Sequence, residues 1–336
     1  MWLVTGGAGY IGAHVVRRLR AAGYAVAVLD DLSTGRADRV PPGVPLVVAH
    51  VADRRTVHAA LRRYGVTGVL HLAARKSAPE SVARPAYYHR ENVGGLSALL
   101  AAMAQAGVHR LVFSSSAAVY GVPGPLPVDE DAPTVPVNPY GHTKLAGERL
   151  IRAAGYRDGL DWVALRYFNV VGAAGATLAD RGHTNLVPLV FDALARGRPV
   201  VVAGVDHPTR DGTGVRDYVH VADIADAHAV AVAALAGGGL AGGGLAGGGL
   251  RRRYNVGTGR GRSVLDVLRT VEAVTGHPVP YRIGPRRPAD PPQVVADPGR
   301  IRRELGWQAR YDLADMVESA WSAWCDASHA ASPVPA

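Results

Sequence analysis

The sequence predicts an α/β fold in which a doubly wound parallel sheet is followed by a smaller α/β domain. Apolar strand-like runs alternate with helical patterns through the first half, a glycine-rich turn follows the first run, and two acids end the second. Alternation of this kind indicates parallel strands joined by helices. We place the first domain at 1–169 and the second at 170–336, with parts of 216–260 returning to the first.

The first strand, turn and helix form one unit. An apolar run at 2–5 leads into Gly-Gly-Ala-Gly-Tyr-Ile-Gly at 6–12, and helical spacing follows. Gly6 allows a tight turn, Gly9 lets the backbone approach a pyrophosphate, and Gly12 lets helix and sheet pack closely. The pyrophosphate would lie on the helix N-terminus, where free N–H groups favour negative charge.

The second apolar run, at 26–29, ends in two acids. Asp30 follows Gly12 by 18 residues, which is about where a carboxylate meets the adenine ribose hydroxyls of a bound dinucleotide. Asp30 and Asp31 together would repel a 2′-phosphate. We therefore expect NAD rather than NADP as the cofactor, although Arg36 is a nearby cation.

Further runs continue the alternation. Helical spacing predicts a helix around 57–64, a long helix over 88–106, and a third helix that begins just after Pro139. Between and after them we expect strands at 46–48, 69–72, 110–113 and 162–166. Ligands of such sheets bind at the carboxyl ends of the strands, and Ser114-Ser115-Ser116 stands at one of these ends.

Tyr140 and Lys144 are four residues apart on the third of these helices, so their side chains share one face. A tyrosine with a pKa of about 10 is a poor base at neutral pH. An adjacent cation favours the ionised form, so Lys144 is expected to lower the pKa of the Tyr140 hydroxyl. Such pairs are common on exposed helices, but a strand-end serine and a dinucleotide fold upstream make this pair a candidate catalytic site.

Composition excludes several classes of protein. The net charge is +9, yet no basic helix with interleaved aromatic residues is present, so no nucleic-acid partner is expected. Cys325 is the only cysteine, which excludes a disulfide framework and favours the cytoplasm. His71, His142 and His220 lack metal-ligand spacing, and no metal site is expected. Met1 leads directly into the first strand, so no signal peptide is expected.

An uncharged stretch runs from 229 to 250 and is long enough to suggest a membrane span. Its last part, 236–250, is Ala-Gly-Gly-Gly-Leu three times over, and glycine at that density is a poor helix former. We therefore expect a helix over 223–235, a flexible insertion over 236–250, and no membrane partner.

Together with later motifs, these features resemble the extended short-chain dehydrogenases/reductases and, among them, the UDP-glucose (UDP-galactose) 4-epimerases. The resemblance covers nearly the whole chain. The glycine turn, the serines and the Tyr140–Lys144 pair mark the superfamily. The epimerase group is indicated by Leu-Arg-Tyr-Phe-Asn at 165–169 and Asp-Gly-Thr-Gly-Val-Arg-Asp-Tyr-Val-His at 211–220, and Ser-Val-Leu-Asp-Val at 263–267 continues the match.

The resemblance implies reversible oxidation of a UDP-sugar at C4 through a 4-keto intermediate. Tyr140 would remove the proton of the 4-hydroxyl while hydride moves to NAD, Lys144 would hold the nicotinamide ribose, and Ser116 would hydrogen-bond the same hydroxyl. NAD would stay bound through each turnover. The implied cofactor-binding residues are Gly6, Gly9, Tyr10, Ile11, Gly12, Asp30, Asp31, Lys76, Asn92, Tyr140, Lys144 and Tyr167.

The resemblance also implies where the UDP-sugar binds. Asn169, Arg216 and Arg287 would contact the diphosphate, which suits the planar fork of an arginine, and Asp290 would contact the uridine ribose. The implied substrate-binding residues are Ser116, Tyr140, Phe168, Asn169, Asn185, Arg216, Tyr218, Arg287, Asp290 and Val294.

Four positions depart from the family pattern. Residues 49–52 read Ala-His-Val-Ala where an acid is usual, Ala118 replaces a threonine, and Ala203 replaces an aromatic residue near the uracil. Val294 stands where several relatives carry a bulky tyrosine in the sugar pocket. The smaller side chain predicts tolerance of an N-acetyl group at C2.

Three alternatives remain open. A nucleotide-sugar 4,6-dehydratase would need an Asp-Glu pair after the strand-end serine, where this chain has Ala117-Ala118. Another 4-epimerase, acting on UDP-GlcNAc or a UDP-uronic acid, would share all the motifs above. A silent NAD-binding regulator would be expected to lose Tyr140 or Lys144.

The resemblance further implies a homodimer in which the 88–106 helix and the Tyr140 helix of each subunit form a four-helix interface. An apolar stripe on the first of these helices suits such an interface, but it would equally suit packing on the chain's own sheet. The stripe consists of Leu96, Leu99, Leu100 and Met103.

Overall fold

The computed structural model describes all residues except 125, 183, 239–248, 288–289 and 331–336. The predicted flexible insertion over 236–250 falls largely on 239–248 and so lies outside the described residues. Among the helices that are described, none is both long and apolar enough to cross a membrane.

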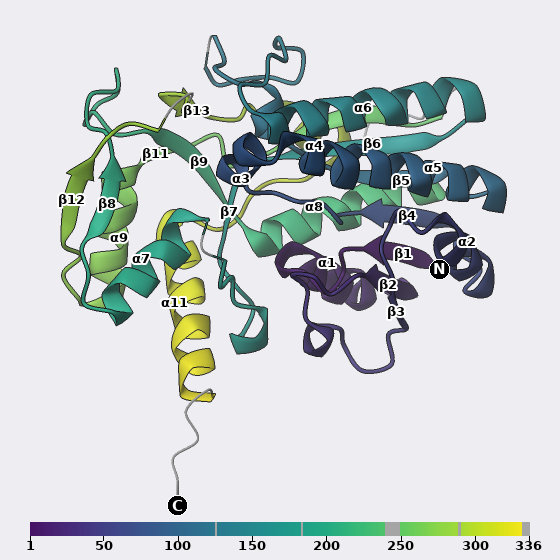
Figure 1. Ribbon diagram of the computed structural model, residues 1–336, viewed down its shortest axis with the longest axis horizontal. Coiled ribbons are helices and arrows are strands. Elements are labelled where there is room, and N and C mark those ends of the chain that lie inside the picture. Colours follow the sequence, from purple (N-terminus) through teal and green to yellow (C-terminus); the bar gives the residue numbers. More distant parts are fainter. Residues whose placement is uncertain (125, 183, 239–248, 288–289, 331–336) are drawn as a thin grey trace, which may run out of the picture.

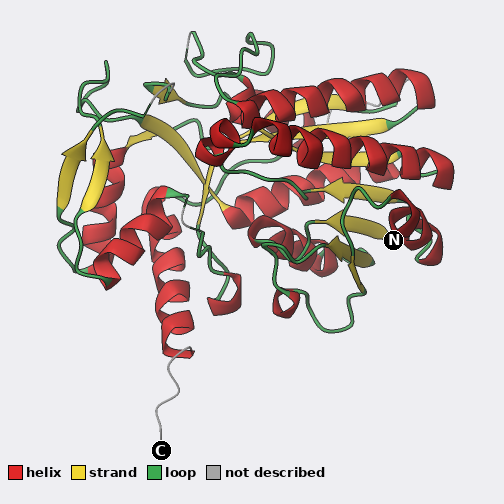
Figure 2. Cartoon of the chain, in the orientation of Figure 1, coloured by secondary structure: helices red, strands yellow, loops and turns green. Residues whose placement is uncertain are grey.

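A seven-stranded sheet forms the larger part of the molecule, and all its neighbouring strands are parallel (Figures 1 and 2). Its order is β10-β6-β5-β4-β1-β2-β3, so the chain runs outward from β1 in both directions, which is the doubly wound order of a Rossmann fold. This confirms the predicted fold class. The strands are β1 (Trp2–Thr5), β2 (Val26–Asp30), β3 (Leu46–Val48), β4 (Gly68–His71), β5 (Arg110–Ser116), β6 (Asp161–Tyr167) and β10 (Arg251–Val256).

Helices cover both faces of this sheet. One face packs against α1 (Tyr10–Ala21) and α8 (Val221–Ala233), and the other against α2 (Arg54–Arg63), α5 (Gly95–Ala106) and α6 (Pro139–Asp158). The apolar stripe predicted on the 88–106 helix faces this second core, because its four residues are at most 9% exposed within their own chain. The stripe therefore packs on its own sheet.

The elements expected in the first half are present, with two differences. The helix expected over 88–106 is interrupted, since α4 (Pro85–Tyr88) passes through a π-helical turn at His89–Gly94 before α5 begins. Helix α6 starts at Pro139 itself rather than after it, because Asn138 caps the helix by accepting from the Gly141 N–H at 2.9 Å and proline suits the first helical position. A short helix, α3 (Ala78–Ala83), precedes α4.

The remaining elements form a smaller body beside the carboxyl ends of the large sheet (Figure 1). One sheet contains β11 (Gly261–Ser263), β9 (Val215–His220) and β13 (Gln293–Val294), with β7 (Asn169–Val171) also paired to β9. A second sheet pairs β8 (Val200–Ala203) with β12 (Tyr281–Gly284). The helices here are α7 (Leu186–Ala195), α9 (Val264–Thr275) and α11 (Leu313–Ala330), whereas α10 (Gly299–Leu305) packs on the core of the large sheet beside β10.

Candidate active site

The glycine turn between β1 and α1 is closely packed. Gly6 has a φ of +71°, and a Cβ added there would lie 2.6 Å from the Ala73 nitrogen. A Cβ at Gly12 would lie 2.1 Å from the Gly6 carbonyl oxygen. Gly9 is the N-cap of α1, and no side chain caps this 12-residue helix. The first N–H groups of the helix are therefore free to bind an anion.

A cavity of about 600 Å³ opens in front of this turn. Eight of the residues predicted to bind the cofactor line it, namely Gly6, Gly9, Tyr10, Ile11, Gly12, Asp30, Asp31 and Lys76. Its wall also contains side chains that the sequence did not single out, among them Arg39, His50, Arg75, Glu91, Asp180 and Arg181. At its far end the cavity reaches Ser114 on β5.

The two acids after β2 are held differently. Both carboxylate oxygens of Asp30 accept backbone N–H bonds, from Ala8 and from Leu32, each at 2.9 Å. Burial raises the pKa of Asp30. Asp31 accepts from the Ser33 N–H at 3.0 Å and lies 3.7 Å from the Arg75 guanidinium.

Four predicted cofactor residues do not line the cavity, namely Asn92, Tyr140, Lys144 and Tyr167. The Asn92 amide bonds the backbone N–H and carbonyl of Arg75 at 2.8 and 3.0 Å, and so holds a segment of the cavity wall. The Tyr167 hydroxyl lies 2.6 Å from Nε2 of His228. Since Nδ1 of His228 donates to the Ile224 carbonyl at 2.8 Å, Nε2 accepts the tyrosine proton.

Ser116, Tyr140 and Lys144 meet at the carboxyl end of β5. The Ser116 hydroxyl lies close enough to the Tyr140 hydroxyl to lower the pKa of the phenol, and the Lys144 ammonium lies 5.9 Å from the centre of the Tyr140 ring. The ammonium donates to the Ser114 carbonyl at 2.8 Å. Lys144 is only 4% exposed, and burial lowers its pKa to about 8.

Burial opposes the expected lowering of the pKa of Tyr140. Burial raises the pKa of Tyr140, and the bond from Ser116 offsets this only in part. Lys144 lies over the ring and points its ammonium at a carbonyl oxygen rather than at the phenol. The sequence could place both groups on one helix face, but the direction of the pKa shift depends on how deeply they are buried.

A buried ion pair fixes the helix that carries Tyr140 and Lys144. Arg166 on β6 donates to both carboxylate oxygens of Glu148 on α6, at 2.8 and 2.6 Å, and the two side chains are 0% and 5% exposed. Ser115 donates to the same carboxylate at 2.6 Å. No local pattern in the sequence pairs Arg166 with Glu148, although Arg166 lies inside the 165–169 motif.

Strand β9 is the centre of the residues expected to bind substrate. Arg216 forms an ion pair with Asp290 and stands opposite Val294 in the strand register. Asn169 on β7 stands opposite Tyr218, further along the same strand.

Three more predicted substrate residues come from flanking segments. Phe168 packs in one cluster with Val294, and the Arg287 carbonyl accepts from the Asp290 N–H at 3.3 Å. Asn185 donates to Asp180 at 2.6 Å, which ties it to the wall of the cofactor cavity.

The model of the NAD dependent epimerase/dehydratase family matches residues 2–257. The chain belongs to this family. It is 45% identical to a UDP-glucose 4-epimerase of Azospirillum brasilense over 326 residues, which cover 96% of this chain and 91% of that one.

Solved structures of this family are similar over nearly the whole chain. A UDP-glucose 4-epimerase of Stenotrophomonas maltophila, crystallised with NAD and formylated UDP-arabinopyranose, has a TM-score of 0.90, 40% identity and coverage of 98% and 99%. An epimerase of Bifidobacterium longum in complex with NAD⁺ and UDP has a TM-score of 0.87, 36% identity and coverage of 97% and 98%.

NAD is the cofactor of this family member, and the residues present fit it. The uncapped N-terminus of α1 opens into the cavity and can receive the pyrophosphate, while the glycines keep its approach clear. Asp30 and Asp31 line the same cavity, where carboxylates suit ribose hydroxyls. Arg36, the cation that could have favoured a 2′-phosphate, pairs with Asp38.

Proposed function

We propose that this protein is a UDP-glucose 4-epimerase that interconverts UDP-galactose and UDP-glucose through a 4-keto intermediate. The observation that carries the proposal is the meeting of Ser116, Tyr140 and Lys144 beside the NAD cavity, with Ala117 and Ala118 directly after the serine. The names of the relatives support the choice of sugar nucleotide.

The site's own residues would handle the proton. When bound, NAD supplies the acceptor and the donor of the hydride at C4. Tyr140 takes the proton of the 4-hydroxyl and returns it, with Ser116 hydrogen-bonded to the same oxygen. Because burial raises the pKa of Tyr140, its ionised form needs a neighbouring cation, and Lys144 supplies one.

The substrate's charged part would lie along β9. Arg216 and Arg287 contact the diphosphate, Asp290 contacts the uridine ribose, and Asn169 and Tyr218 complete this wall. Arg287 is exposed and its guanidinium has no ion pair among the described residues, so it is available to a phosphate. Arg216 is held by Asp290 until substrate arrives.

A dehydratase is disfavoured by the residues after Ser116. Elimination of water across C5 and C6 needs an acid and a base next to the sugar. Ala117 and Ala118 form a 3₁₀ turn there and offer neither. Oxidation and reduction at C4 alone need no further acid or base.

The test is to incubate the purified protein with UDP-galactose, without added NAD, and to identify the product by NMR. We expect UDP-glucose. A stable 4-keto-6-deoxy sugar would show that the protein is a dehydratase. No reaction would show that UDP-galactose is not a substrate.

Val294 supports a second substrate. It is 7% exposed and packs in a cluster with Phe168 and Tyr120, and by the family resemblance it replaces a bulky tyrosine of the sugar pocket. We propose that UDP-N-acetylgalactosamine is also turned over. Val294→Tyr should reduce turnover of UDP-N-acetylgalactosamine much more than that of UDP-galactose, and wild-type protein with no activity on the N-acetyl substrate would disprove this.

We also propose a division into an NAD domain, 1–169 with α8 and β10, and a sugar-nucleotide domain formed by the rest of 170–336. Family resemblance supports a homodimer built on α5 and α6, and the single cysteine supports a cytoplasmic location. Light scattering after size-exclusion chromatography tests the dimer, and a monomer at micromolar concentration would contradict it.

A further inference from the structure

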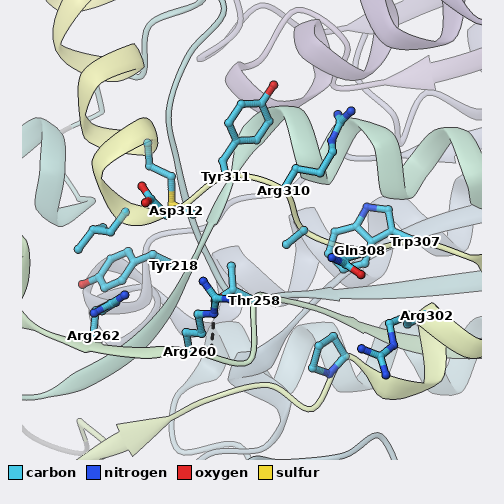
Figure 3. Close-up of a pocket in the computed structure, with 15 residues that line it drawn as sticks. Tyr218, Thr258, Arg260, Arg262, Arg302, Trp307, Gln308, Arg310, Tyr311 and Asp312 are labelled. Carbon is cyan, nitrogen blue, oxygen red and sulfur yellow. Dashed lines mark hydrogen bonds between the residues drawn. The ribbon is translucent and has the colours of Figure 1, made fainter.

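A second cavity, of about 490 Å³, lies between the loop that follows β10 and the segment that joins α10 to α11 (Figure 3). It shares no lining residue with the NAD cavity. Its volume is within the range typical of small-molecule sites. Of the residues in its lining, the proposed epimerase reaction uses Tyr218 alone.

Two buried acids hold its walls in place. Asp217 accepts from the N–H groups of Thr258 and Gly259 at 2.8 and 2.9 Å, and so fixes the loop after β10. Asp223 fixes the opposite wall, where its backbone carbonyl accepts from the Trp307 indole at 3.0 Å and its carboxylate accepts from the Arg310 N–H at 3.1 Å. The cavity is therefore formed before any ligand binds.

The lining carries positive charge that the protein does not neutralise. Arg260, Arg262 and Arg302 are exposed, and within the described chain their guanidinium groups make no hydrogen bond or ion pair. Arg310, by contrast, pairs with Asp226. Asp312, the one acid in the lining, caps α11 by accepting from the Asp315 N–H at 3.0 Å.

Apolar groups complete the lining. Pro298, Ala309, Leu313 and Met316 contribute aliphatic surface, and Tyr311 stands at the edge of the cavity (Figure 3). Three unpaired arginines beside an apolar wall match a molecule with a phosphate at one end and an apolar or aromatic group at the other.

We propose that this cavity is a second binding site that takes a phosphate-bearing small molecule of mononucleotide size. It is distinct from the substrate site, but the two share a wall. Tyr218, an expected substrate residue, also lines the cavity, and Arg262 stands opposite Arg216 in the register of β11 and β9. A test must therefore keep both the NAD cavity and the substrate site occupied.

The probe is AMP, titrated by calorimetry into NAD-loaded protein that is saturated with UDP. We expect one AMP per chain, with adenosine binding at least tenfold more weakly because it lacks the phosphate. Arg260→Ala/Arg262→Ala should weaken AMP binding at least tenfold. Its matched control is Arg55→Ala/Arg62→Ala on α2, which removes the same charge from exposed positions outside the cavity and should bind AMP as the wild type does.

Several results would overturn the proposal. They are no AMP binding to UDP-saturated protein, adenosine binding as tight as that of AMP, and equal weakening in the two double variants. Both exchanged arginines are exposed and unpaired, so melting temperatures near that of the wild type verify folding. Arg302→Ala is a second, independent variant on the opposite wall, and unchanged AMP binding in it would also count against the site.

Discussion

The cofactor cavity and the substrate residues are held by different kinds of interaction. The cavity is set by backbone geometry and buried groups, since Gly6 and Gly12 leave no room for a Cβ and Asp30 is held by two backbone N–H groups. The proposed substrate residues depend on side-chain pairs nearer the surface, such as Arg216 with Asp290. The first arrangement suits a cofactor that stays bound, and the second suits a substrate that must leave. Changes at the reacting centre, in the scaffold and around β9 should therefore have separable effects.

The largest effect is expected at the point where the two regions meet. Tyr140→Phe keeps the ring but removes the proton acceptor, so kcat should fall about 1,000-fold while the NAD content of the purified protein is unchanged. Tyr156→Phe, on the same helix but 72% exposed, is the matched control and should have wild-type activity. A fall in kcat of less than tenfold in Tyr140→Phe would show that Tyr140 is not the base.

Changes in the scaffold behind the cavity should lower the free energy of unfolding. Glu148→Gln leaves the fully buried Arg166 without a counter-charge, and removing one partner of such a pair costs about 3 kcal/mol. Denaturant unfolding measures this loss. Glu318→Gln, an exposed change on α11, should cost almost nothing, and equal stability of the two variants would contradict the assigned role of the pair.

Lys144 tests the cost of burying a charge in the cofactor region. Its pKa in the folded protein is about 8, below the usual 10.5. Between these two pH values the unfolded chain binds more protons than the folded protein, so the free energy of unfolding rises with pH. Lys144→Met removes that charge. The variant should be more stable than the wild type at pH 7, by about 3 kcal/mol, and the gap should close towards pH 10.

Activity and the pH dependence of stability together test whether the buried charge of Lys144 destabilises the fold but is needed for catalysis. The methionine variant should be nearly inactive although it is more stable, since no cation then favours the ionised Tyr140. Thermal unfolding followed from pH 6 to pH 10 gives the stability gap. A gap that does not change with pH would show that the buried charge is not its cause.

The smallest effect is expected around β9. Asp290→Asn frees Arg216 from its ion pair and removes the expected ribose contact. KM for UDP-galactose should therefore rise about tenfold, which corresponds to about 1.4 kcal/mol of binding free energy. The NAD content should not change. Asp206→Asn is the control, because Asp206 pairs with Arg286 at 3.6 Å on the surface. A fall in kcat at unchanged KM would place Asp290 in the reaction rather than in binding.

The same contrast explains what the sequence could predict. The glycine turn, Asp30 and the Ser116–Tyr140–Lys144 group were predictable because each depends on local spacing or on the end of a strand. Glu91 and Asp180 join the cavity wall from segments far apart in the chain, and no local pattern brings them together.

The depth at which side chains are buried was the second feature that the sequence could not predict. It raises the pKa of Tyr140 where the neighbouring lysine alone predicted a lower value. It also decides that the stripe on α5 belongs to the core, a choice that the helical period left open. Both outcomes depend on long-range packing, which spacing along the chain does not encode.

In the proposed reaction, one carbon of the sugar is oxidised and then reduced within a site whose NAD stays bound. The most direct measurement uses UDP-galactose carrying deuterium at C4, with no added NAD, and follows the label in the product by NMR and mass spectrometry. We predict UDP-glucose that keeps the deuterium at C4 through many turnovers per bound NAD. Loss of the label to water, or conversion that stops without added NAD, would contradict the account.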